Sequence, residues 1–245
     1  LQDGKPITAY YYSTSCGYGT DDRIWKEEGE GAAPYLRSVH IAQDENKESQ
    51  EISEQTDTTQ TDELQKKSEQ EEVLREYLTT VHEDYEKEEP WYRWSYTVQD
   101  LDIDLLKKKL QERGISFTDF KKVKDMEIIR RAAGGSARTL VISTDQGELQ
   151  VEGEYEIRYV LNQEGKVIRQ DDSEYTLSTI LPSAYFVMDL QKGKKGITGY
   201  TLSGGGFGHG VGMSQNAAKA MAQSGKTYEE ILAMFYWNCQ LAKKY

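Results

Sequence analysis

A glycine-rich passage near the C-terminus contains the residues of this chain best suited to chemistry. It covers residues 203–215, reads SGGGFGHGVGMSQ, and places His209 among six glycines. Glycine permits positive φ angles and lets a ligand approach the backbone closely. The passage leads into a predicted helix, whose free N–H groups favour hydrogen-bond acceptors. It lacks the Gly-Lys-Ser/Thr ending of a phosphate loop. From its glycines and the helix start we predict that the passage binds a ligand and that the His209 ring is accessible.

A second passage, residues 13–17, reads STSCG and follows a predicted strand. Its hydroxyl groups suit a polar ligand, although ordinary turn chemistry explains them equally well. Cys16 and His209 could form a thiol–imidazole pair with Asn216 or Asn238 as the orienting group, but no local signature supports such a hydrolase. Cys16, His209 and Cys239 have the spacing of no standard zinc module. We therefore expect no metal and no cofactor.

A third passage is the basic turn at residues 130–138, which contains Arg130, Arg131 and Arg138. It could bind an anionic or sugar ligand. It could equally be a turn between two strands with solvated arginines. The sequence leaves both readings open.

The elements that must position these passages read as an α+β fold, a mostly antiparallel β-sheet body with several short helices. Alternation and turn signals predict a β-meander over 120–152, with a hairpin turn at 145–147. Thr227 and Glu230 form a capping box that opens a helix. Further strands are predicted at 5–15, 35–42, 185–190 and 197–202, and helices at 62–86, 101–113, 154–161, 213–224 and 228–237.

Charge divides the 245 residues into two parts. The chain has 42 acidic and 30 basic residues, and residues 44–89 carry 17 of the acids but only 5 of the bases. We assign residues 1–42 and 90–245 to a neutral body and 43–89 to an acidic insert. Residues 43–61 are too polar to pack and should form a mobile loop. Within 62–86, Val73, Tyr77, Val81 and Tyr85 suggest one apolar helical stripe, with Leu74 and Leu78 beside it.

Composition excludes several classes of function. No apolar run approaches the length of a membrane span, and no basic face signals nucleic acid. Two cysteines cannot form a disulfide-dense scaffold. The chain begins at Leu1 and not at Met, so we expect a processed or cut piece of a longer protein, with an export signal or anchor upstream.

These passages together resemble the stage II sporulation protein D family, also called the SpoIID/LytB domain. The most specific match is GFGHGVGMSQ. The others are STSCGY followed by Trp25 and Pro34-Tyr35-Leu36, the turn from Ile129 to Arg138, Arg158, LPSAYF at 181–186, and the stretch from Tyr228 to Tyr236. The resemblance extends over nearly all of the chain outside residues 43–89.

The resemblance implies a lytic transglycosylase that acts on peptidoglycan glycan strands lacking stem peptides. Such enzymes cleave between N-acetylmuramic acid and N-acetylglucosamine and leave a 1,6-anhydro product. One carboxyl group then serves as acid and base. The family's catalytic Glu lies on a helix before the STS strand, and no matching stretch occurs here. We expect that residue upstream of Leu1 and assign no catalytic residue in this chain.

The alternative implied by the resemblance is a non-catalytic glycan-binding module or an enhancer of a cell-wall amidase. The expected partners are glycan strands and a cell-wall amidase or another cell-wall hydrolase. The expected location is extracytoplasmic, at the cell surface or the forespore-engulfing membrane. The predicted substrate-binding residues are Ser13, Ser15, Cys16, Gly17, Arg138, Ser183, His209, Gly210, Gly212, Met213, Ser214 and Gln215.

Overall fold

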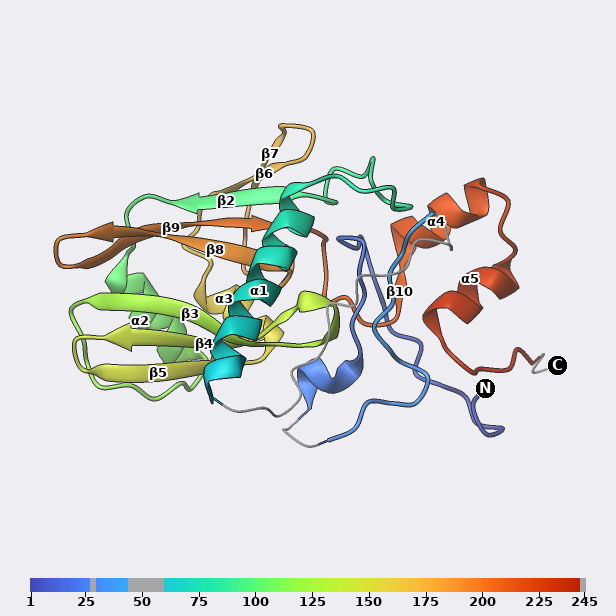
Figure 1. The fold of residues 1–245 in the computed structure, drawn as a ribbon, viewed down its shortest axis with the longest axis horizontal. Helices are drawn as coiled ribbons and strands as arrows, with labels where there is room; N and C mark the ends of the chain where they lie inside the picture. Colours follow the sequence, from blue (N-terminus) through green and yellow to red (C-terminus); the bar gives the residue numbers. More distant parts are fainter. Residues whose placement is uncertain (27–29, 44–59, 243–245) are drawn as a thin grey trace.

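The computed structural model describes residues 1–26, 30–43 and 60–242, and side chains in α1 from residue 69 onward. It confirms the α+β class, with mostly antiparallel strands and short helices (Figure 1). Most of the predicted loop at 43–61 falls outside the described residues. No described helix is both long and apolar enough to cross a membrane.

A five-stranded antiparallel sheet forms one layer of the body. Its strand order is β7 (Glu174–Thr176), β6 (Lys166–Arg169), β2 (Trp94–Val98), β9 (Gly196–Gly204) and β8 (Phe186–Gly193). The predicted β-meander forms a second sheet from β3 (Val123–Arg131), β4 (Ala137–Thr144) and β5 (Gly147–Glu152). Its β4–β5 hairpin turns at the predicted residues.

The main core lies where these sheets and two helices meet. Along β4, Leu140 and Ile142 are fully buried at alternate positions, the period-2 pattern of a strand with one buried face. Helix α2 (Ile103–Glu112) buries Leu106 and Leu110 in the same core, and the side chain of Asp102 caps its first turn. Helix α3 (Glu154–Val160) follows β5 directly, as the sequence predicts.

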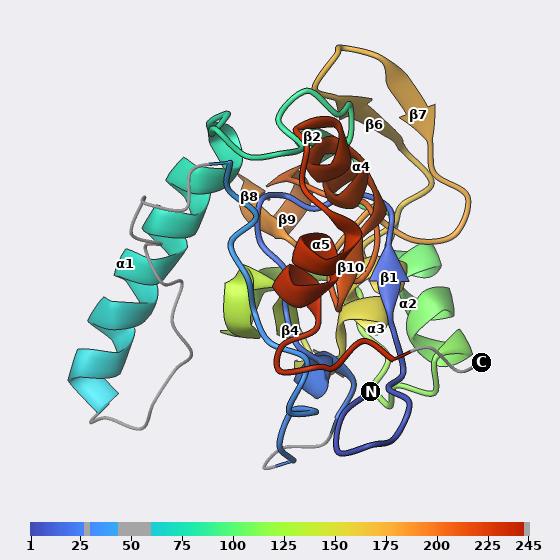
Figure 2. The same cartoon turned by 90° about the vertical axis from the view of Figure 1, so that its right-hand side faces the viewer.

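A smaller unit at the other end carries both chain termini (Figures 1 and 2). The 3₁₀ helix Asp22–Trp25 packs there with α4 (Gln215–Gln223) and α5 (Tyr228–Phe235) around a second apolar cluster. Both hydrogen bonds of the predicted capping box at Thr227 and Glu230 are present. The predicted strand 5–15 shortens to β1 (Tyr11–Tyr12), which pairs in parallel with β10 (Met213–Ser214).

Helix α1 (Gln60–Thr79) crosses one side of the body (Figure 2). It buries Leu74 and Leu78, whereas Val73 is 42% exposed and Val81, which lies beyond the helix, is 55% exposed. The prediction that Val73 and Val81 face the body was therefore wrong. Helix α1 also ends seven residues before residue 86, where the predicted helix ends. Ion pairs fix α1 to the two sheets at 2.8 Å, joining Arg75 to Asp189 and Glu71 to Arg131.

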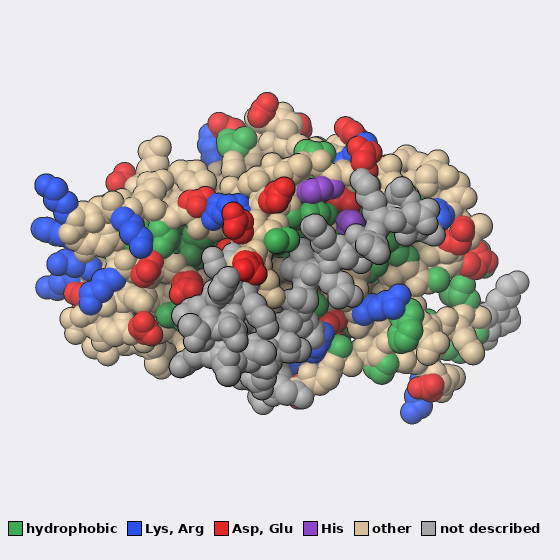
Figure 3. Space-filling model, viewed as in Figure 1, with side chains coloured by type: hydrophobic (Ala, Val, Ile, Leu, Met, Phe, Trp, Pro, Cys, Tyr) green, Lys and Arg blue, Asp and Glu red, His purple; other side chains and the backbone are tan. Residues whose placement is uncertain are grey.

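Charge is also uneven on the surface of the body. Figure 3 shows basic side chains gathered at the end that lies opposite the smaller unit. There the end of β8 exposes Lys192, and the turn between β8 and β9 exposes Lys194 and Lys195. The formal net charge of −12 is thus not spread evenly over the molecule.

Candidate functional site

The glycine-rich passage after β9 is threaded between other backbone segments. Within the passage, Phe207 forms a β-bridge with Thr14, and Val211 forms one with Thr20, before the chain enters β10. Gly208 donates its N–H to the Pro182 carbonyl at 2.9 Å. Gly212 has a φ of +75°, and a Cβ there would overlap the Tyr10 carbonyl oxygen. The glycines of this passage therefore allow backbone segments to pack closely, which is a different use from the ligand approach that the sequence predicts.

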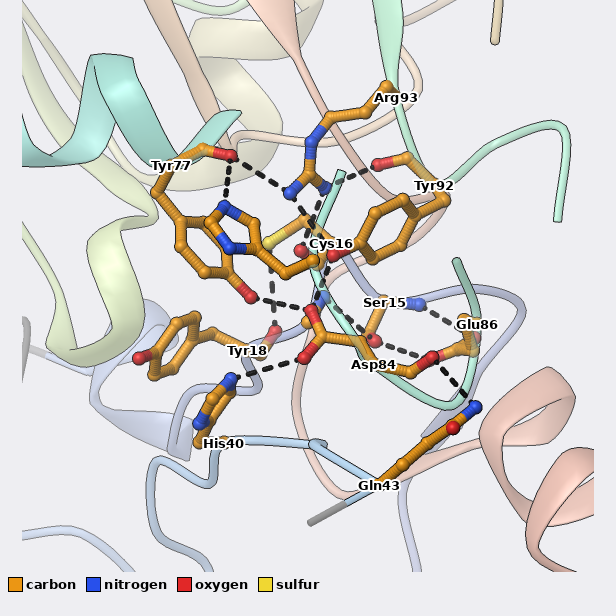
Figure 4. Close-up of polar contacts among 12 residues, drawn as sticks. Ser15, Cys16, Tyr18, His40, Gln43, Tyr77, Asp84, Glu86, Tyr92 and Arg93 are labelled. Atoms are coloured by element: carbon orange, nitrogen blue, oxygen red, sulfur yellow. Dashed lines mark hydrogen bonds and ion pairs between the residues drawn. The ribbon is translucent and has the colours of Figure 1, made fainter. Parts of the chain in front are cut away.

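A buried carboxyl group joins two of the predicted passages. Glu86 accepts hydrogen bonds from the Ser15 N–H at 3.0 Å and from the Ser214 hydroxyl at 2.7 Å, and the Ser15 hydroxyl also donates to it. Figure 4 shows the contact between Ser15 and Glu86. Glu86 belongs to the predicted acidic insert, yet it is only 1% exposed. We call Glu86, Ser15 and Ser214 the carboxyl clamp.

Burial dominates the acidity of Glu86. It raises the pKa of this carboxyl to about 7, although the hydrogen bonds from Ser15 and Ser214 act in the opposite direction. Removing an ionised carboxylate from water disfavours its charged form, while donors that bond to the anion favour it. Near neutral pH, Glu86 therefore holds a proton for part of the time.

A second buried acid, Asp84, lies beside the clamp in the same segment. It accepts hydrogen bonds from the Tyr77 hydroxyl at 2.6 Å, from the Tyr92 hydroxyl, and forms a contact with His40 Nε2 at 3.2 Å (Figure 4). Burial alone would raise the pKa of Asp84, but the bonds from His40, Tyr77 and Tyr92 bring it below its usual value. This carboxylate therefore stays charged and ties α1 to the segment that follows it.

The Arg93 guanidinium completes this connection. It donates to the Cys16 carbonyl and the Tyr77 carbonyl, both at 2.9 Å, and lies 3.9 Å from the Tyr92 ring centroid. Its donors thus connect the STSCG passage with α1. Residues 80–93 are consequently part of the framework of the site.

Cys16 has the surroundings of an inert thiol. It is 1% exposed, and burial raises its pKa to about 11 despite the nearby Arg93. A thiol is a poor nucleophile unless it is deprotonated. The amide of Asn216 donates to Thr14 at 2.9 Å. These contacts argue against the thiol–imidazole alternative.

His209 lies in an aromatic cluster. Its ring centroid is 5.0 Å from that of Trp25 and 5.7 Å from that of Tyr12. Its Nδ1 accepts the Val211 N–H at 3.0 Å. Burial lowers the pKa of His209, so the imidazole is neutral at neutral pH. Its role is that of a fixed polar ring beside Trp25.

A buried ion pair lies behind this cluster. Glu154 and Arg158 meet at 2.8 Å with both side chains almost fully buried. Arg158 also donates to the carbonyls of Leu181 at 2.9 Å and Pro182 at 3.0 Å. The Trp25 indole N–H donates to Glu154 Oε1 at 3.4 Å. Sequence reasoning missed Glu154; its spacing of four residues before Arg158 on a predicted helix was the available signal.

The structure divides the predicted substrate-binding residues into two groups. One group is buried and serves the framework: Ser15, Cys16, Gly17, Ser183, Gly210, Gly212 and Ser214. Ser183, for example, donates its hydroxyl to the Gly205 carbonyl at 2.6 Å. The other group has access to solvent: Ser13, Arg138, His209, Met213 and Gln215. Substrate contact stays a prediction for all of them.

No three His, Cys, Asp or Glu side chains in residues 1–26, 30–43 and 69–242 are placed to hold a metal ion. The described carboxylates near the motif passages are instead engaged by serine, tyrosine, histidine or arginine.

Comparisons with known proteins give the relatives of this chain. A family model described as "Domain of unknown function (DUF8618)" matches residues 20–212. The protein named "Amidase enhancer" of Bacillus subtilis (strain 168) is 26% identical over 238 residues, which is 96% of this chain and 29% of that protein. "Stage II sporulation protein D" of the same organism is 46% identical over 43 residues, or 18% of this chain and 12% of that protein.

The chain thus spans less than a third of the length of the curated relatives it matches. The family model, however, covers most of the chain, and its range includes Trp25, Glu86, Glu154 and His209. The chain therefore belongs to the DUF8618 domain family and is related to the SpoIID/LytB family.

Proposed function

We propose that this chain binds peptidoglycan glycan strands outside the cytoplasm and enhances a cell-wall amidase without cleaving the strands. The relative named as an amidase enhancer supports this reading, because the similarity extends over 96% of the chain. A sugar-handling role is what the resemblance of the motif passages implies. Strand binding would bring an amidase to its substrate through a raised local concentration.

The observation that carries the proposal is the carboxyl clamp. Burial raises the pKa of Glu86, yet this side chain is 1% exposed and bonded to Ser15 and Ser214. A general acid must come within hydrogen-bond reach of the bond that it protonates. Glu86 is sealed from such contact, and Glu154 is held by Arg158. Neither of these two carboxyl groups is placed to reach a substrate bond, which supports an enhancer that does not cleave the strands.

The test combines the chain with glycan strands stripped of stem peptides and with a purified cell-wall amidase. We expect the chain to co-sediment with the strands and to increase the rate at which the amidase releases stem peptides from intact peptidoglycan. Serum albumin at the same concentration controls for crowding. An unchanged amidase rate together with no co-sedimentation would overturn the proposal.

Lytic transglycosylase activity is the second candidate, because the resemblance of the motif passages implies it. A pKa of about 7 at Glu86 would suit a group that both gives and accepts a proton near neutral pH, but this carboxyl is 1% exposed and would have to become accessible first. The test is mass spectrometry of denuded strands incubated with the chain and with Glu86→Gln. A 1,6-anhydro product that forms with the unaltered chain and disappears with the variant would establish this candidate over the first.

A further inference from the structure

We propose that Trp25 is a sugar-stacking residue of the glycan-binding surface, on whose indole a pyranose ring packs, and that Glu154 and Arg138 position it. The inference rests on the proposed function and names the site of contact. Nothing in the motif resemblance assigns a role to Glu154.

The Trp25 side chain is both exposed and held in place. Trp25 is 43% exposed although it lies within the structured body. Its ring contacts Tyr10 at 5.1 Å and His209 at 5.0 Å between centroids, with interplanar angles of 61° and 66°. Neither neighbour lies parallel to the indole. An indole held in this way offers aromatic surface to a ligand at little cost in side-chain entropy.

Glu154 anchors the edge of the indole ring. The indole N–H faces Glu154 Oε1 at 3.4 Å, while Arg158 occupies Oε2 at 2.8 Å. Glu154 itself is 3% exposed. A carboxylate can accept several hydrogen bonds at once, so Glu154 holds the indole edge from inside the protein while it also pairs with Arg158.

Side-chain contacts also fix the backbone around Trp25. The side chain of Asp21 caps the 3₁₀ helix Asp22–Trp25, and Asp22 pairs with Lys26 at 2.8 Å. Arg138 donates to the Lys26 carbonyl at 3.0 Å. Arg138, a predicted substrate-binding residue, thus fixes the residue next to Trp25. Contacts of residues before and after Trp25 in the sequence therefore fix the position of the indole.

The other tryptophans differ in what lies over their rings. Arg37 lies over Trp237 at 4.8 Å, and Arg169 lies over Trp91 at 5.3 Å. Trp94 is 4% exposed. The rings beside Trp25 are instead those of Tyr10 and His209, which lie at 61° and 66° to the indole. The negative face of an indole attracts the partly positive C–H groups on one face of a pyranose.

The experiment measures binding of a tetrasaccharide of alternating N-acetylglucosamine and N-acetylmuramic acid, without stem peptides, by calorimetry. We expect Trp25→Ala to weaken binding at least tenfold and Trp25→Phe to weaken it less than fivefold, because phenylalanine keeps an aromatic face. Trp237→Ala is the matched control, since Trp237 is 48% exposed and should not alter the dissociation constant.

Two outcomes separate this inference from the proposed function. Unchanged binding by Trp25→Ala would overturn the stacking role alone. No binding by the unaltered chain would overturn the proposed function, and the inference with it. If Trp25→Ala does not fold, fluorescence provides the second test: the tetrasaccharide should change the emission of the unaltered chain but not that of Trp25→Phe. An identical change in both would refute the inference.

Discussion

The backbone N–H of Ser15 donates to the carboxyl group of Glu86 at 3.0 Å and so joins residues 71 positions apart. The Ser214 hydroxyl reaches the same carboxyl from the far end of the chain. Two predicted sugar-binding serines therefore have an internal partner. That partner is an acid whose protonation changes near neutral pH.

Glu86 should make the stability of the protein depend on pH. Its pKa rises from 4.5 in the unfolded chain to about 7 in the folded protein. The folded state thus binds this proton more tightly, so its stabilising effect is complete below pH 4.5 and is lost as pH rises through 7. The loss amounts to about 3 kcal/mol of unfolding free energy. Urea unfolding between pH 5 and 8 measures it.

Glu86→Gln isolates this effect from other titrating groups. Burial lowers the pKa of His82 and of His209, and these groups act in the opposite direction below pH 6.5. The difference between the unaltered chain and Glu86→Gln should grow in favour of the variant as pH rises. Glu72→Gln, at an exposed acid of α1, is the control and should follow the unaltered chain. If the unfolding free energies of Glu86→Gln and of the unaltered chain changed in parallel with pH, the prediction would be wrong.

Asp84→Asn should strongly destabilise the fold. Tyr77 and Tyr92 both donate to the charged Asp84 carboxylate, and an amide would offer them a weaker acceptor and an unwanted donor. We expect the unfolding free energy to fall by about 2–4 kcal/mol. Asp100→Asn, at an exposed position, is the control and should change it by less than about 0.5 kcal/mol. Equal effects in the two variants would show that the Asp84 contacts contribute little.

The two cysteines should differ in reactivity. Cys16 is buried with a pKa of about 11, whereas Cys239 is partly exposed. Iodoacetamide at pH 8 should therefore modify Cys239 in the folded protein and both residues in 6 M guanidinium chloride, as peptide mass spectrometry can show. Cys16→Ser should leave glycan binding intact. Fast labelling of Cys16 in the folded protein would revive a nucleophilic role.

Gly212→Ala should disrupt the glycine-rich passage. The residue has a φ of +75°, and an added Cβ would overlap the Tyr10 carbonyl oxygen, which belongs to rigid backbone. Strain and overlap together should cost about 2–4 kcal/mol of unfolding free energy. Gly31→Ala is the control, because a Cβ there meets no atom within 4 Å. Thermal unfolding of both variants compares them, and similar midpoints would mean that the passage can shift at little cost.

The sequence predicted well those elements that depend on near neighbours. Helix α2 and the β4–β5 hairpin follow from residues within a few positions of each other. The capping box at Thr227 is equally local. The resemblance of the motif passages to the SpoIID/LytB family is also read from short stretches of sequence, and the curated relatives support it.

The site depended on contacts that local patterns do not encode. Glu86 reads as one acid among many in a polar stretch, and its burial arises from Ser15 and Ser214, which lie 71 and 128 positions away. Trp25 and Glu154 meet across 129 positions. The phase of α1 was misjudged because Leu74 and Leu78 face the body while Val73 does not. Only the folded arrangement distinguishes these residues from their neighbours.

The parallel pairing of β1 with β10 also bears on the order of folding. It brings Tyr11 beside Met213, and the nearby bond between Asn216 and Thr14 spans 202 positions. Contacts that close such long loops must first offset a large loss of chain entropy, so they form late and slowly. The passages around Ser15 and His209 should therefore come together only after both sheets have formed. A chain released early from synthesis would possess the sheets but not the binding surface.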